Sequence, residues 1–126
     1  MPIPTQTLNA LPVAMLLVQP DPNTGVHYNR FVSQPFTDLV GWSLADIPDK
    51  PTWWEKAYPD PGYRDAIERQ WELAVEVASE ENANTVSMEA NITCKSGRQL
   101  RCKVTAVVSD DLVRGHYFVF FEPVSD

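Results

Sequence analysis

The first continuous run of apolar residues in the chain is at residues 13–18. The run ends at the turn-rich stretch Asp-Pro-Asn-Thr-Gly, at 21–25, and a second short strand-like segment follows over 25–31. Two such segments around a turn that contains Pro and Gly are typical of a β-hairpin. We therefore predict two paired strands in this part of the chain.

A helical pattern of apolar residues occupies the middle of the chain, over residues 61–79. Its apolar stripe consists of Tyr63, Ile67, Trp71, Ala74 and either Val77 or Ala78. Residues at this spacing share one face of a helix, so we expect that face to pack and Trp71 to be its inward anchor. Asp60 is placed to cap the helix, and Pro61 suits the first turn because no N–H is needed there.

Shorter helical segments are expected before the long helix. Thr52 and Glu55 have the spacing of a capping box, which predicts a short helix that begins at Trp53. Ser43 and Asp46 repeat this spacing and predict a further helical turn.

The last third of the chain alternates between apolar and polar residues. It predicts three antiparallel strands, near residues 86–93, 98–108 and 113–122. Two strands, then helices, then three strands indicate an α+β fold. We predict a five-stranded antiparallel sheet with short helices and one long helix on one face.

The turn between the third and fourth strands fixes the positions of the two cysteines. A three-residue loop at 95–97, with Gly97 in the left-handed conformation, places Ala90 opposite Cys102. Cys94 then lies about 13 Å along the strand from Ala90, too far for a disulfide. Both thiols are therefore expected to be free.

Both faces of the last two strands carry apolar side chains. We expect one face of the sheet to point toward the long helix and to include Met88 of the preceding strand together with Cys102, Phe118 and Phe120. We expect the opposite face to include Val107, Tyr117, Val119 and Phe121. A sheet with helices on one side normally has polar residues on the other. The second apolar face therefore predicts a symmetric dimer interface, with residues 5–11 of the same chain as an alternative cover.

Composition narrows the class of protein. The chain has 126 residues, of which 44% are hydrophobic, and this suits one domain. Its net charge of -7 argues against nucleic acid or an anionic membrane as a partner. No apolar stretch approaches the roughly 20 residues that cross a bilayer, and no signal peptide is evident, so we expect a cytoplasmic protein. Acidic residues at every fourth helical position, Glu68, Glu72, Glu76 and Glu80, are expected to face solvent.

Several phrases occur in an order that resembles PAS domains, the sensory modules of bacterial signalling proteins such as sensor histidine kinases. Residues 52–64 resemble the segment that leads into the long helix of that family. The other similar phrases are the Leu-Pro lead-in at 11–12, Asn-Arg-Phe at 29–31, the stretch 36–47 and Lys-Ser-Gly at 95–97. The resemblance implies a PAS domain over residues 11–124, preceded by an N-terminal extension at 1–10.

The resemblance also implies a function. PAS modules bind a small molecule or a partner and signal through rearrangement of a dimer to a downstream effector, without catalysis. Ligands of the family lie between the sheet and the long helix, so the candidate binding residues are Tyr63, Ile67, Trp71, Met88, Cys102, Phe118 and Phe120. Alternatively these residues only fill the core, which would leave a ligand-free interaction or dimerisation domain. A small α+β enzyme is a third reading, although no catalytic motif is visible.

Neither haem nor flavin is expected, and no metal site is predicted. The two histidines, His27 and His116, lie on separate predicted strands, and the long helix contains none to serve as an axial ligand in the manner of haem-binding PAS domains. The flavin-binding branch carries a reactive cysteine in its Asn-Cys-Arg-Phe phrase, whereas Asn29 and Arg30 are adjacent here.

Overall fold

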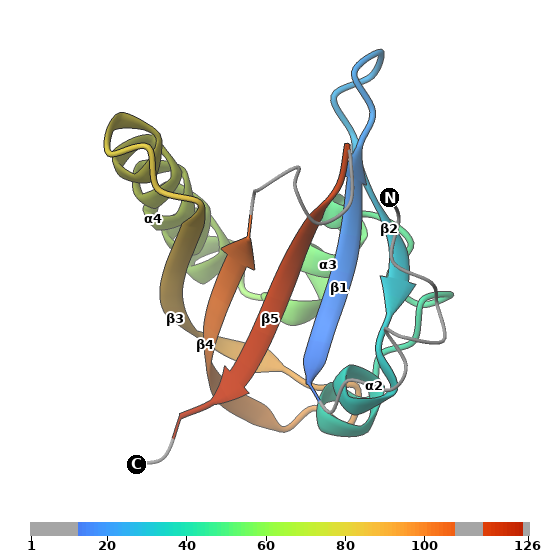
Figure 1. Ribbon diagram of the computed structural model, residues 1–126. Helices are drawn as coiled ribbons and strands as arrows, with labels where there is room; N and C mark the ends of the chain where they lie inside the picture. Colours follow the sequence, from blue (N-terminus) through green and yellow to red (C-terminus); the bar gives the residue numbers. More distant parts are fainter. Residues whose placement is uncertain (1–12, 108–114, 125–126) are drawn as a thin grey trace.

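The computed structural model describes residues 13–107 and 115–124, which form one antiparallel sheet and three helices (Figure 1). The strands are β1 (Ala14–Pro20), β2 (His27–Val32), β3 (Thr85–Thr93), β4 (Gln99–Val107) and β5 (Tyr117–Pro123). The helices are α2 (Gln34–Val40), α3 (Lys50–Ala57) and α4 (Pro61–Glu80). Strand order is β2-β1-β5-β4-β3, and α3 and α4 lie together on one face of the sheet. The α+β prediction is therefore confirmed.

Helix α4 begins as the sequence predicts. The Asp60 carboxylate accepts the Tyr63 N–H at 3.0 Å, and Pro61 occupies the first turn. Along the helix only Ile67 and Ala78 are buried, because α4 packs mainly against the edge strand β3. The four glutamates at every fourth position of α4, Glu68, Glu72, Glu76 and Glu80, are exposed, as expected.

The predicted start of α3 is wrong. The helix begins at Lys50 rather than Trp53, and its N-cap is Asp49, whose carboxylate accepts the Thr52 N–H at 2.9 Å. Pro51 is tolerated because the first turn of a helix does not need its missing N–H. The pair of Ser43 and Asp46 forms only a hydrogen-bonded turn.

A helix that the sequence did not single out, α2, follows β2 directly. Ser33 is completely buried and caps it by accepting the Phe36 N–H, while the Ser33 hydroxyl also donates to the Val13 carbonyl. These bonds attach α2 to the start of β1, and Phe36 on the helix is completely buried in the core. Among the described residues, no helix is long and apolar enough to cross a bilayer.

The β3–β4 hairpin has the predicted register. Ala90 pairs with Cys102, and Gly97 has a φ of 93°. Both cysteines are buried and free, so this prediction is confirmed.

The expected orientation of β5 is wrong by one residue. Phe121 pairs with Val104 and with Ala14, which places it on the inner face that contacts the helices. Tyr117 and Val119 share that face, whereas Phe118 and Phe120 point to the other side of the sheet. Two apolar faces carry no signal that distinguishes inside from outside, and the register of β5 depends on the connection at 108–116, whose length alone does not fix the parity. Of the four residues expected on the outer face, only Val107 lies there.

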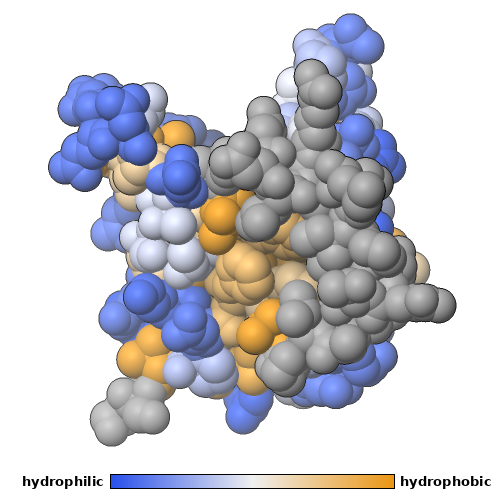
Figure 2. Space-filling model, viewed as in Figure 1, coloured by the Kyte–Doolittle hydropathy of each residue, from blue (hydrophilic) through white to orange (hydrophobic). Residues whose placement is uncertain are grey.

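Two apolar clusters result, one on each side of the sheet. The main core contains Phe36, Trp53 and Phe121, whose rings meet edge to face with centroids 5.1–5.7 Å apart. The outer cluster consists of Met15, Leu17 and Phe118, with the partly buried Phe31, Val107 and Phe120 against them. Figure 2 shows apolar surface at the centre of this face. Residues 1–12, which include the N-terminal extension and the alternative cover, lie outside the described residues, and so do residues 108–114.

Candidate functional site

A small cavity of about 50 Å³ lies between the inner face of the sheet and helices α3 and α4. All five strands and both helices contribute to its lining, which is mostly apolar. The lining residues are Leu16, Val18, Asn29, Lys50, Trp53, Trp54, Tyr58, Ile67, Trp71, Met88, Val104, Tyr117 and Val119. We call this space the inner cavity.

The connection between α3 and α4 places an aromatic wall on the inner cavity. Tyr58 packs edge to face against Trp54 on one side and Tyr63 on the other, with centroids 5.1 and 6.1 Å apart. The Arg64 guanidinium donates to the Tyr58 carbonyl at 3.0 Å, which ties the first turn of α4 to the end of α3. Burial raises the pKa of Tyr58 above its ordinary value, so its phenol is neutral.

Two polar side chains of the lining are already engaged. The Asn29 amide donates to the Ile47 carbonyl at 2.7 Å, and the backbone N–H of Asn29 bonds to Pro48. The Tyr117 hydroxyl lies 2.6 Å from Nδ1 of His27, and burial raises the pKa of Tyr117 to about 12. Burial first and then the charge of Lys50 lower the pKa of His27, which favours the neutral ring.

A larger polar space of about 460 Å³ lies beside the inner cavity. It is bounded by the β1–β2 turn, α3 and α4, and we call it the outer chamber. Its ionisable residues are His27, Lys50, Glu55, Arg64, Glu68 and Glu72. Lys50, Trp54 and Trp71 line both spaces, so these three residues mark where the two meet.

The structure brings together some of the seven candidate binding residues. Ile67, Trp71 and Met88 line the inner cavity. Tyr63 and Cys102 belong to the surrounding core; the Tyr63 hydroxyl accepts the Asn91 N–H, and burial raises the pKa of Cys102 to about 11. Phe118 and Phe120 lie on the opposite face, as described above.

Other lining residues were missed. The sequence pattern places Tyr117 and Val119 on the wrong face, and it does not single out Trp53, Trp54 and Tyr58 as binding residues. The sequence signal for these three was present in the aromatic run at 53–58. Lys50 carried no signal, because the predicted helix began after it.

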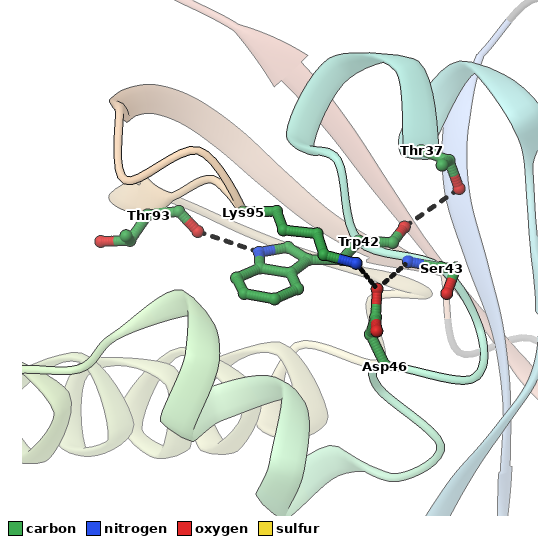
Figure 3. A network of polar contacts seen from close by, with 6 residues as sticks. All are labelled: Thr37, Trp42, Ser43, Asp46, Thr93 and Lys95. Atoms are coloured by element: carbon green, nitrogen blue, oxygen red, sulfur yellow. Dashed lines mark hydrogen bonds and ion pairs between the residues drawn. The ribbon is translucent and has the colours of Figure 1, made fainter.

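A separate polar network fixes the loop after α2 to the β3–β4 hairpin (Figure 3). The Trp42 indole donates to the Thr93 carbonyl at 3.0 Å, and Lys95 forms an ion pair with Asp46 at 3.0 Å. The Ser43 N–H and then the Lys95 ammonium lower the pKa of Asp46 to about 2. The network lies away from the inner cavity and serves to hold the two segments together.

Solved structures with this architecture identify the fold. The PAS domain of a LuxR-family transcriptional regulator from Burkholderia thailandensis, in complex with ethanol, matches with a TM-score of 0.67 and 17% identity, over 98% of this chain and 100% of that chain. The PAS domain of the fruit-fly ELK potassium channel matches with a TM-score of 0.63 and 16% identity, over 97% of this chain and 94% of that chain. The Rhodobacter sphaeroides LOV protein matches with a TM-score of 0.63 and 10% identity, over 95% of this chain and 64% of that chain.

The chain therefore has the PAS fold. No protein-family model matches it, and no curated protein does. The inner cavity occupies the space between sheet and helices where the sequence resemblance predicted a ligand.

Cofactor binding can be tested against the size of the inner cavity. A cavity of about 150 Å³ is the size that admits a benzene molecule. The inner cavity is smaller, and a three-ring flavin does not fit it as it stands. Among the described residues no three potential metal ligands lie together. The predicted absence of haem and flavin stays a prediction.

Proposed function

We propose that this chain is a sensory or regulatory module of a signalling protein, and that a small molecule enters the inner cavity. The observation that carries the proposal is the lining of that cavity. It is built from all five strands and from both α3 and α4, so an occupant lies between the sheet and the two helices. Binding there changes how the helices pack on the sheet, and the sheet transmits the change to its outer face.

The outer cluster supports the second part of this proposal, in which the change reaches the outer face of the sheet. Met15, Leu17 and Phe118 are buried within a single chain, so a second copy would contact the half-buried Phe31, Val107 and Phe120. A symmetric contact through this surface is the commonest way for an apolar patch to be covered. The alternative function, an interaction domain without a ligand, keeps this surface and leaves the inner cavity without an occupant.

Ligand binding is tested with purified protein and two matched variants. Native mass spectrometry looks for a bound small molecule, and thermal unfolding is then measured with ethanol and 1-butanol as probes. Val119→Leu adds a methylene at the inner cavity, whereas Val107→Leu makes the same change on the outer face. We expect Val119→Leu to abolish stabilisation by the alcohols and Val107→Leu to retain it.

The contradicting outcome is equally specific. Protein without a bound molecule, and with an unfolding temperature that neither alcohol changes, would favour the ligand-free interaction domain.

A further inference from the structure

Among the described residues, Lys50 is the one ionisable residue of the outer chamber that also lines the inner cavity. Its ammonium lies 5.6 Å from the centroid of the Trp54 ring, and Trp54 lines both spaces as well. The Lys50 ammonium therefore lies beside a residue that is shared by the polar outer chamber and the apolar inner cavity.

The Lys50 ammonium lacks a strong counterion. Among the described residues no carboxylate forms an ion pair with it. Burial lowers the pKa of Lys50 below its ordinary value, and the more distant Glu68 and Glu72 only partly oppose this effect. A partly desolvated cation gains from an anion placed in contact with it.

The size of the inner cavity limits the apolar group that can be attached to such an anion. A water-sized group needs about 10–15 Å³ of this kind of space, so a 50 Å³ cavity holds roughly three to five heavy atoms. The lining offers mainly apolar and aromatic side chains, and the Asn29 amide and the Tyr117 hydroxyl bond to other protein atoms. A short hydrocarbon chain matches both the volume and the chemistry.

Among the described residues, the outer chamber has three carboxylates, two cationic side chains and His27, whose lowered pKa favours its neutral form, so its total charge does not select an anion. The positions of the charged side chains favour an anion instead. Glu55, Glu68 and Glu72 do not line the inner cavity, and a ligand whose hydrocarbon end occupies that cavity presents its polar end to Lys50.

We propose that the ligand of this module is a short-chain monocarboxylate, with its hydrocarbon end in the inner cavity and its carboxylate paired with the Lys50 ammonium. This inference rests on the proposed function and adds the chemical class of the ligand. Trp54 and Trp71 flank the bound molecule where the two spaces meet.

The test compares butyrate, 1-butanol and acetate in two-dimensional NMR titrations of the full chain. Butyrate and butanol have the same number of carbons and differ in charge, whereas acetate keeps the charge and lacks the longer chain. We expect butyrate to bind more tightly than either of the other two, with shift changes at residues of the inner cavity.

Two substitutions of Lys50 and one control test whether the Lys50 charge causes the preference for butyrate. Lys50→Met should weaken butyrate binding about tenfold, as expected for a lost charge-assisted hydrogen bond, and leave butanol binding nearly unchanged. Lys50→Arg should retain the preference for butyrate. Lys56→Met is the control, because Lys56 also lies on α3 over an aromatic ring, that of Trp42, but lines neither space.

The outcomes separate the two proposals. If butanol binds as tightly as butyrate and Lys50→Met changes neither, the carboxylate inference is overturned and the sensory module stands. If neither compound binds and native mass spectrometry finds no molecule, both proposals fail. The wild-type comparison and Lys50→Arg still decide the matter if Lys50→Met does not fold.

Discussion

Trp71 is half-buried, although the helical pattern marked it as the inward anchor of α4. It lies against the main core and lines both the inner cavity and the outer chamber. Replacing Trp71 with Ala should lower the free energy of unfolding by about 2 kcal/mol, less than the ~3–5 kcal/mol typical of a fully buried aromatic residue, because part of the side chain already contacts solvent. Phe36→Ala, at a completely buried position, should show the larger loss. Denaturant unfolding measures both, and equal losses would contradict this account of Trp71.

Asp46 should make the stability of the fold depend on pH in the acidic range. Its pKa is lowered from 3.8 to about 2 by the Ser43 N–H and the Lys95 ammonium. Since the folded pKa lies below the unfolded one, the carboxylate stabilises the fold above about pH 4, and this contribution is lost as the pH falls through about 2. The stability difference between wild type and Asp46→Asn should therefore be constant near neutral pH and shrink in that acidic range.

Denaturant midpoints at a series of pH values measure this difference. Lys95→Met removes the second cause of the lowered pKa, so it should reduce the acid-dependent part. A difference that stays the same down to about pH 2 would show that the Ser43 and Lys95 contacts do not act on this carboxylate.

At the scale of one element, α3 shows which side chain caps a helix. Asp49→Ala removes the acceptor of the Thr52 N–H and should cost about 1 kcal/mol. Thr52→Ala, at the position that the sequence favoured as the cap, should cost clearly less. Chemical denaturation distinguishes the two, and a larger loss for Thr52→Ala would restore the predicted capping box.

The elements also show what the sequence could and could not predict. The start of α4 and the β3–β4 register followed from local signals, a cap at Asp60 and a short loop with left-handed Gly97. The orientation of β5 did not, because its partners β1 and β4 are set by tertiary packing. That one-residue error put Phe118 and Phe120, two of the seven candidate binding residues, in the place of Tyr117 and Val119. The sequence also failed to place Lys50 in a helix. Asp49 and Thr52 can both cap this helix, and only the packed structure decides between them.

At the scale of the whole molecule, the outer cluster predicts a dimer in solution. Sedimentation over a series of protein concentrations should show a dimer for the wild type and a monomer for Phe120→Glu, because a buried charge without a partner is unfavourable at an interface. Leu73→Glu is the control, since Leu73 is 61% exposed on α4, away from this surface. A wild-type protein that is monomeric at every concentration would favour a cover from within the chain.

The position of β5 between β1 and β4 has a consequence for how the chain folds. The β1–β5 pairing closes a loop of about 100 residues, and the entropy lost in closing it precedes most of the contacts that offset it. Until β5 is available, β1 and β4 each have an unpaired edge in the middle of the future sheet. A chain synthesised from its N-terminus therefore completes the sheet only after its final strand emerges, and until then it presents open strand edges to other chains.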